Sequence, residues 1–129
     1  MLRHLVPEQI RTPFARYSHG VEIPVGSRLL VCSGQLGIAA DDAIPDGAEA
    51  QSKLCFEAIR ALLREAGMDV SDIVRLNAYV TAREHMAGYM AARDAFIGTP
   101  PPASTLMIVC GFTREEFVVE IEALAAKVA

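Results

Sequence analysis

The chain closes on the stretch Glu116-Phe117-Val118-Val119-Glu120-Ile121-Glu122-Ala123-Leu124-Ala125, in which two sets of side chains alternate. Side chains on a β-strand point alternately to its two faces, so this period of two predicts a strand with one apolar face. The opposite face carries Glu120 and Glu122, about 7 Å apart along the strand. That acidic face is either solvated, as on a half-buried antiparallel strand, or lines a polar cleft.

Two helical patterns and several further strands precede this stretch. Apolar residues recur at helical spacing from Asp46, an expected N-cap, to about Ala66, and again over residues 84–96. Gly67 is well placed to end the first helix. The expected strands cover residues 1–6, 21–24, 28–33, 74–81 and 104–110, and a hairpin turn at residues 25–27 joins the second and third of them.

This order of elements, ββαβαββ, predicts an α+β sandwich in one domain that spans residues 1–129. Two helices are expected to cover one face of a mainly antiparallel sheet, which leaves the other face without a cover. That open face is expected to carry Leu29 and Val31 or their alternates, together with Leu106, Ile108 and Val118. A face so apolar is unfavourable in water, so self-association through it is expected.

Composition narrows the classes of function. The net charge is −4 without any basic run, which disfavours binding to a nucleic-acid backbone. Cys32, Cys55 and Cys110 lie in apolar runs, are expected to be buried reduced thiols, and lack the spacing of metal ligands. No metal or cofactor is therefore expected. No segment resembles a signal peptide or reaches transmembrane length, so a cytoplasmic protein without membrane contact is expected.

Two polar segments and one helix offer candidate site residues. The segment Tyr17-Ser18-His19-Gly20 is either a plain polar loop or a lid beside a cleft. Ser33 and Gly34 end an apolar strand, where a hydroxyl and backbone N–H groups are available to a ligand; without a nearby base, Ser33 is no nucleophile. In the second helix, Arg93 and Asp94 are expected at exposed positions.

Five segments together resemble the RidA/YjgF family of reactive intermediate deaminases, also known as L-PSP endoribonucleases. They are Tyr17-Ser18-His19-Gly20, Ser33-Gly34-Gln35-Leu36, the turn from Gly67 to Val74, Pro102-Ala103, and Glu120-Ile121-Glu122-Ala123. The resemblance spans the chain in the right order. It implies a homotrimer of chorismate-mutase-like subunits that form a barrel, with a small-molecule cleft at each subunit interface.

The resemblance also implies roles for single residues. Tyr17 and Ser33 match residues that line the family's cleft, and Glu122 matches the glutamate that orients the water attacking an imine carbon. An arginine that grips the substrate carboxylate directly follows Pro-Ala in the family, but here that position is Ser104. The family's cleft cysteine corresponds to Leu106, and the asparagine of its second helix falls at about Met90.

The missing arginine weakens the expected binding of a substrate carboxylate. Each charge-assisted hydrogen bond to a carboxylate contributes about 1.5–3 kcal/mol, which a serine hydroxyl does not replace. With Glu120 and Glu122 facing the cleft, a carboxylate ligand also meets uncompensated negative charge. The usual 2-imino acids are therefore expected to be poor substrates, unless a cation reaches in from a neighbouring subunit.

Three functions remain open on the sequence alone. The first is a hydrolase or deaminase of a C=N compound, with Glu122 as base and with Ser33 and the backbone of Gly34 as donors. The second is a non-catalytic trimer that binds a metabolite or a protein. The third is a ribonuclease, which the acidic balance and the lack of interleaved basic and aromatic residues disfavour.

Overall fold

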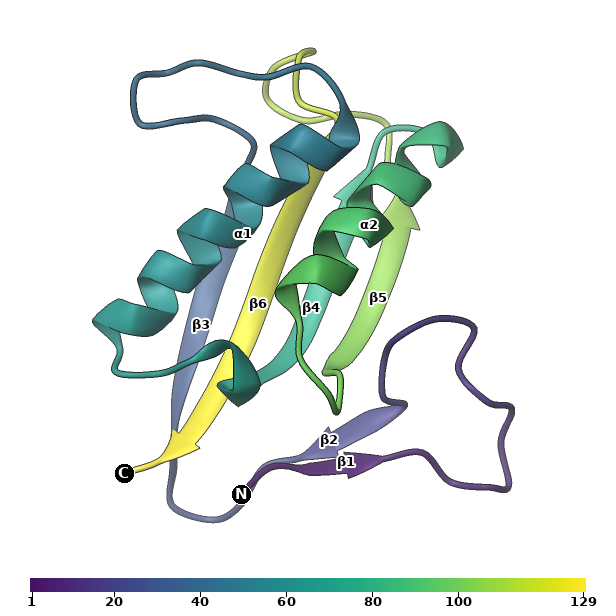
Figure 1. Cartoon of the computed structure of the whole chain (residues 1–129), viewed down its shortest axis with the longest axis vertical. Coiled ribbons are helices and arrows are strands. Elements are labelled where there is room, and N and C mark those ends of the chain that lie inside the picture. Colours follow the sequence, from purple (N-terminus) through teal and green to yellow (C-terminus); the bar gives the residue numbers. More distant parts are fainter.

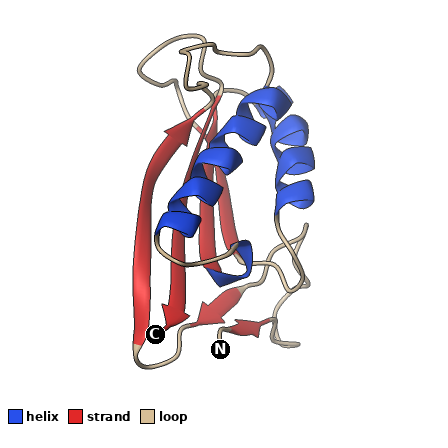
Figure 2. Ribbon diagram, turned by 60° about the vertical axis from the view of Figure 1, so that its left-hand side comes forward, coloured by secondary structure: helices blue, strands red, loops and turns tan.

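The computed structural model describes all of residues 1–129 and places two helices on one side of a four-stranded sheet (Figures 1 and 2). Its elements are β1 (Arg3–Leu5), β2 (Gly20–Glu22), β3 (Ser27–Leu36), α1 (Ala48–Glu65), β4 (Ile73–Val80), α2 (Met86–Phe96), β5 (Ala103–Ile108) and β6 (Val119–Val128). Single turns of 3₁₀ helix precede β4 and α2. The predicted α+β class is confirmed.

The main sheet has the strand order β3-β6-β4-β5, visible from left to right in Figure 1. β6 pairs antiparallel with both β3 and β4, whereas β4 and β5 run parallel. The last strand of the sequence therefore lies inside the sheet, where its apolar face is buried under the helices. Val119, Ile121 and Ala123 are buried on that side, and Glu120 and Glu122 are only partly buried. The predicted alternation is confirmed.

The predicted hairpin at residues 25–27 is wrong. β2 pairs with β1 in a separate two-stranded sheet, and β3 pairs with β6. The turn itself exists and includes Gly26 with φ +85°. Turn residues indicate that the chain changes direction, but they do not indicate which strands pair on either side of the turn.

Both ends of α1 are marked by glycines, Gly47 before the helix and Gly67 after it. The N-cap of α1 is Gly47, which has no side chain to cap the helix, so the expected cap at Asp46 is wrong. The helix ends before Gly67, whose φ of +70° is a conformation that favours glycine. That stop is confirmed.

The sheet face opposite the helices is uncovered in the single chain, as the turned view in Figure 2 shows. Its edge strands carry exposed apolar side chains, with Leu29 60%, Val31 77% and Met107 54% exposed. The prediction was wrong about Leu106, which packs against the helix-side core while its neighbour Met107 takes the open face.

Two further sequence expectations meet the structure here. Cys32 and Cys55 are buried, but Cys110 is exposed because β5 ends at Ile108, before it. The expectation of a buried thiol is therefore wrong at Cys110. No helix has the length and apolar character needed to cross a membrane.

Candidate functional site

Glu122 is held on the open face by two neighbours from the adjacent strand. Its Oε1 accepts a hydrogen bond from the Tyr79 hydroxyl at 2.7 Å and another from Nδ2 of Asn77 at 3.1 Å. β4 and β6 pair so that Asn77 lies directly across from Glu122. Both bonds fall on the same oxygen, so Oε2 remains available to a ligand or a water molecule. The hydrogen bond to Glu122 is also the main reason that the pKa of Tyr79 is raised.

Arg75 extends this polar line along β4. Its Nε donates to Oδ1 of Asn77 at 2.6 Å, and its Nη2 donates to the Thr105 hydroxyl at 2.7 Å. The bond to Oδ1 turns the Asn77 amide so that its nitrogen faces Glu122. Arg75, Asn77 and Tyr79 alternate along one strand and therefore share the open face.

Glu120 lies beside the bulge that interrupts the pairing of β3 and β6 between Cys32 and Gln35. A methyl group at Gly34 would come within 2.5 Å of the Glu120 Oε2, so the carboxylate lies directly against this glycine. Partial burial, followed by the negative charge of Glu122, raises the pKa of Glu120. Both effects favour the protonated form of Glu120.

Two hollows border these carboxylates. One, of about 250 Å³, is lined by Val31, Cys32, Arg75, Asn77, Glu122, Ala123 and Leu124. The other, of about 360 Å³, is lined by Gly34, Tyr79, Val109, Gly111, Phe112, Glu120 and Glu122. Glu122 lines both hollows. It therefore lies at the centre of a polar strip on the open face, which consists of Arg75, Asn77, Tyr79, Glu120 and Glu122.

Ser104, Leu106 and Met90 gather elsewhere in the chain. Ser104 and Leu106 pair with Leu76 and Ala78, whose side chains are buried beneath the helices, so all four share the helix side of the sheet. Met90 packs against the same core from α2. Within one chain, Ser104 therefore lies on the opposite side of the sheet from Glu122, and the expected cleft between subunits stays a prediction.

Two buried polar residues of α2, Tyr89 and Arg93, lie near Ser104. Burial raises the pKa of Tyr89, whereas the neighbouring Arg93 guanidinium and Ser104 hydroxyl favour its ionised form. Arg93 is only 4% exposed and is paired with Asp94 at 3.0 Å, so the expectation that Arg93 is exposed is wrong. A guanidinium thus lies near position 104, supplied by α2 instead of β5.

Tyr17 lies in the loop that precedes β2, and this loop runs beside the start of β5. Its hydroxyl accepts a hydrogen bond from the Phe14 N–H at 3.2 Å. The loop is fastened to the β5 end by the N–H of Ser18, which donates to the Pro102 carbonyl at 3.0 Å. Ser33 is exposed in the β3 bulge, on the opposite edge strand from Tyr17.

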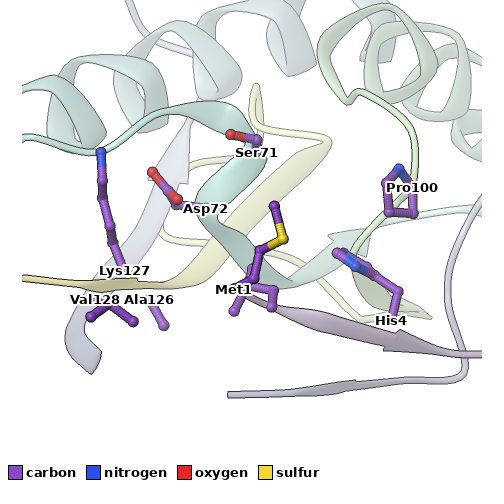
Figure 3. A pocket seen from close by; sticks show the side chains of 9 residues that line it. Met1, His4, Ser71, Asp72, Pro100, Ala126, Lys127 and Val128 are labelled. Carbon is purple, nitrogen blue, oxygen red and sulfur yellow. The ribbon is translucent and has the colours of Figure 1, made fainter. Parts of the chain in front are cut away.

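A larger hollow, of about 480 Å³, lies between the two chain ends (Figure 3). Met1, His4, Asp72, Lys127 and Pro100 are among the residues that line it. Asp72 is occupied in accepting the N–H of Asp69, and burial lowers the pKa of His4, which disfavours its charged form. These side chains offer no paired acid and base, so this hollow is a weaker candidate than the strip around Glu122.

The candidate site combines Glu120, Glu122 and Gly34, which the sequence analysis named, with four residues that it did not name: Arg75, Asn77, Tyr79 and Thr105. The signal was present, because a strand with polar residues at every second position has one polar face. Its meaning depended on the strand order, which places β4 beside β6 and brings the polar faces of both strands together.

Comparisons with known proteins are consistent across sequence and structure. The family model described as endoribonuclease L-PSP matches residues 8–127. A 2-iminobutanoate/2-iminopropanoate deaminase from Salmonella typhimurium is 26% identical over 131 residues, covering 98% of this chain and 99% of that protein.

Two solved structures show the same fold. A Rid-family protein of unknown function, YyfB from Yersinia pestis, superposes with a TM-score of 0.84 at 29% identity over 98% of both chains. RidA from the Antarctic bacterium Psychrobacter sp. PAMC 21119 gives a TM-score of 0.72 at 25% identity, over 97% of this chain and 99% of that one.

Proposed function

The chain belongs to the endoribonuclease L-PSP family of Rid and YjgF proteins, and on that premise we propose that it hydrolyses the C=N bond of a small imine or enamine metabolite. The observation that carries this proposal is the fixed carboxylate of Glu122. One of its oxygens is held by Tyr79 and Asn77, and the other is free beside two hollows. The relative described as an imine deaminase supports the same class of reaction.

The two carboxylates divide the proton transfers between them. Glu122 accepts a proton from a water molecule as the water oxygen bonds to the imine carbon. Glu120, whose pKa is raised, delivers a proton to the nitrogen, which gives a tetrahedral carbinolamine. Glu122 then passes its proton to the same nitrogen while Glu120 takes the hydroxyl proton, the C–N bond breaks, and a carbonyl compound and an amine or ammonia leave. We assign the stabilisation of the developing charge to the backbone N–H of Gly34 and the Ser33 hydroxyl.

The cleft is completed by a second copy of the chain. Within one chain, Glu122 and Glu120 face the open side, whereas Ser104, Leu106 and Met90 face the helix side at the β5 edge. A neighbouring copy that packs on the apolar open face brings its β5 edge and its Tyr17 loop to the carboxylates of the first. This arrangement gives both groups of predicted site residues a common cleft in a homotrimer.

The β5 side of that cleft excludes the usual 2-imino acids. Ser104 provides no charge there, Leu106 and Met90 are apolar, and the nearby guanidinium of Arg93 is buried and paired with Asp94. A carboxylate attached directly to the imine carbon has no strong partner on this side.

A panel of imines tests the proposal. We expect the wild type to hydrolyse neutral imines and to accelerate 2-iminobutanoate hydrolysis only weakly, while Ser104→Arg gains activity on 2-iminobutanoate. Glu122→Gln in either background removes turnover. Fast wild-type hydrolysis of 2-iminobutanoate that Ser104→Ala leaves unchanged would show that the carboxylate is gripped elsewhere.

A non-catalytic binding trimer is the alternative, and the absence of charge on the β5 side is the observation that favours it. In that case the hollows bind a metabolite and Glu122 only accepts a hydrogen bond. Ligand binding that Glu122→Gln preserves, with no turnover of any imine by the wild type, identifies this alternative.

A further inference from the structure

Arg75 is a cation without an acidic partner on the face that carries the two glutamates. None of the three ion pairs of the chain includes it. Its guanidinium is nevertheless held in place, since Nε donates to Asn77 and Nη2 donates to Thr105. A guanidinium has five N–H donors, so most of them remain available after these two bonds.

The surroundings of Arg75 fit a small anion that has an apolar body. Arg75 lines the hollow of about 250 Å³ together with Asn77 and Glu122, and the apolar side chains of Val31 and Leu124 form its other wall. A fixed guanidinium binds a carboxylate through two parallel N–H bonds, and the apolar wall accepts a short hydrocarbon chain.

On the open face, exposed apolar side chains lie on the edge strands and the polar side chains around the hollow lie on the central strands. Leu29 and Val31 lie on edge strand β3 and Met107 lies on edge strand β5, where a second copy would pack. Arg75 lies on β4 and Glu122 on β6, the two central strands. A second copy that packs along these edges would narrow the mouth of the hollow, and Val31, which lines the hollow, would lie at the boundary between the two copies.

We propose that Arg75 is the carboxylate anchor of this protein and that its ligands are small monocarboxylates whose carboxylate lies several bonds from the C=N carbon. The spacing follows from Asn77, whose amide lies between the Arg75 guanidinium and the Glu122 carboxylate and bonds to both. A ligand that meets Arg75 and a water molecule on Glu122 spans at least that amide. The inference rests on the proposed function for its substrate class, because the hollow holds Glu122.

Carboxylate binding provides a test that does not require turnover. Butanoate and hexanoate are titrated against the intact wild-type protein while the arginine side-chain Nε–H signals are followed by NMR. We expect the Arg75 signal to shift and hexanoate to bind more tightly than butanoate, because its longer chain covers more of Val31 and Leu124. Butylamine, with the opposite charge, should leave the Arg75 signal unchanged.

Matched variants assign the effect to the residue. Arg75→Gln should weaken hexanoate binding by about tenfold or more, the loss expected for a charge-assisted pair. Arg28→Gln removes the same charge from β3, where Arg28 donates to the Ala66 carbonyl, and should leave binding unchanged. Unaltered hexanoate binding by Arg75→Gln, or equal weakening in both variants, would overturn the assignment.

The two proposals fail separately in this design. If hexanoate binds through Arg75 but no imine is hydrolysed, the anchor stands and the hydrolase does not. If neutral imines are hydrolysed and Arg75→Gln changes neither hexanoate binding nor the preference for imines with a remote carboxylate, the anchor is wrong and the hydrolase stands.

Discussion

At the scale of single residues, Glu120 and Glu122 differ because their neighbours differ. Glu122 accepts two hydrogen bonds on one oxygen, from Tyr79 and Asn77. Glu120 lies over Gly34, and its partial burial and the negative charge of Glu122 both disfavour its charged form. The two carboxylates on one strand face therefore lie in different environments, which is the basis of the separate roles proposed for them.

The raised pKa of Glu120 has a consequence for stability. The folded state holds the Glu120 proton at pH values where the unfolded chain has lost it, so the free energy of unfolding falls as pH rises through this range. We expect Glu120→Gln to be more stable than the wild type at pH 7, with the difference shrinking as pH falls below the ordinary glutamate pKa. Thermal unfolding at pH 7 and pH 4 measures it.

Glu115→Gln is the control for a general loss of negative charge, since Glu115 is exposed in the turn before β6. A Glu120→Gln protein no more stable at pH 7 than Glu115→Gln would contradict the environment described for Glu120.

The sequence predicted these residues unevenly, for a physical reason. Glu120 and Glu122 stand out because the alternation of one strand reveals them without knowledge of any partner. Arg75 and Asn77 acquire meaning only when β4 is known to pair with β6, which no local pattern specifies. The buried position of Arg93 likewise depends on the packing of α2 over β5.

At the scale of elements, the contact between α1 and β3 is set by a glycine. A methyl group at Gly37 would overlap the Gln51 side chain and come within 2.7 Å of its backbone Cα. Gln51 joins three segments, because its amide donates to the carbonyls of Pro45 and Glu116 and accepts the N–H of Val118. Displacing α1 at this point therefore disturbs the loop before the helix and the start of β6.

We expect Gly37→Ala to lower the free energy of unfolding by about 1–3 kcal/mol, because backbone must move to admit the methyl group. Gly34→Ala is the matched control, since its methyl group meets only the end of the flexible Glu120 side chain, and should cost less than about 1 kcal/mol. Chemical denaturation of both variants gives the comparison. Equal losses would show that the approach of α1 to β3 is not the constraint.

Elements with strong periodicity were predicted well, and pairing between them was not. The two helices and β6 follow from spacing alone. The hairpin prediction for residues 25–27 failed because β3 finds its partner at the opposite end of the chain, in β6. Such long-range pairing is decided by burial in the finished sheet.

At the scale of the whole molecule, the open sheet face predicts self-association, and the family resemblance implies that the assembly is a trimer. Exposed Leu29, Val31 and Met107 are too apolar to remain in water across one face. Light scattering at micromolar concentration should give three times the chain mass. We expect Val31→Glu to reduce this mass, whereas Val25→Glu should not, because Val25 is fully exposed in the turn before β3. A monomer mass for the wild type would contradict this assembly.

The central claim is that two copies of the chain share each catalytic cleft, with carboxylates from one and the β5 edge from the other. The direct measurement is imine hydrolysis after subunits of two inactive variants, Glu122→Gln and Leu106→Asp, are mixed and reassembled. Random mixing in equal amounts should restore about a quarter of the clefts, because some interfaces then combine an intact β5 edge with an intact Glu122. Activity that stays at the level of the unmixed variants would contradict a shared cleft.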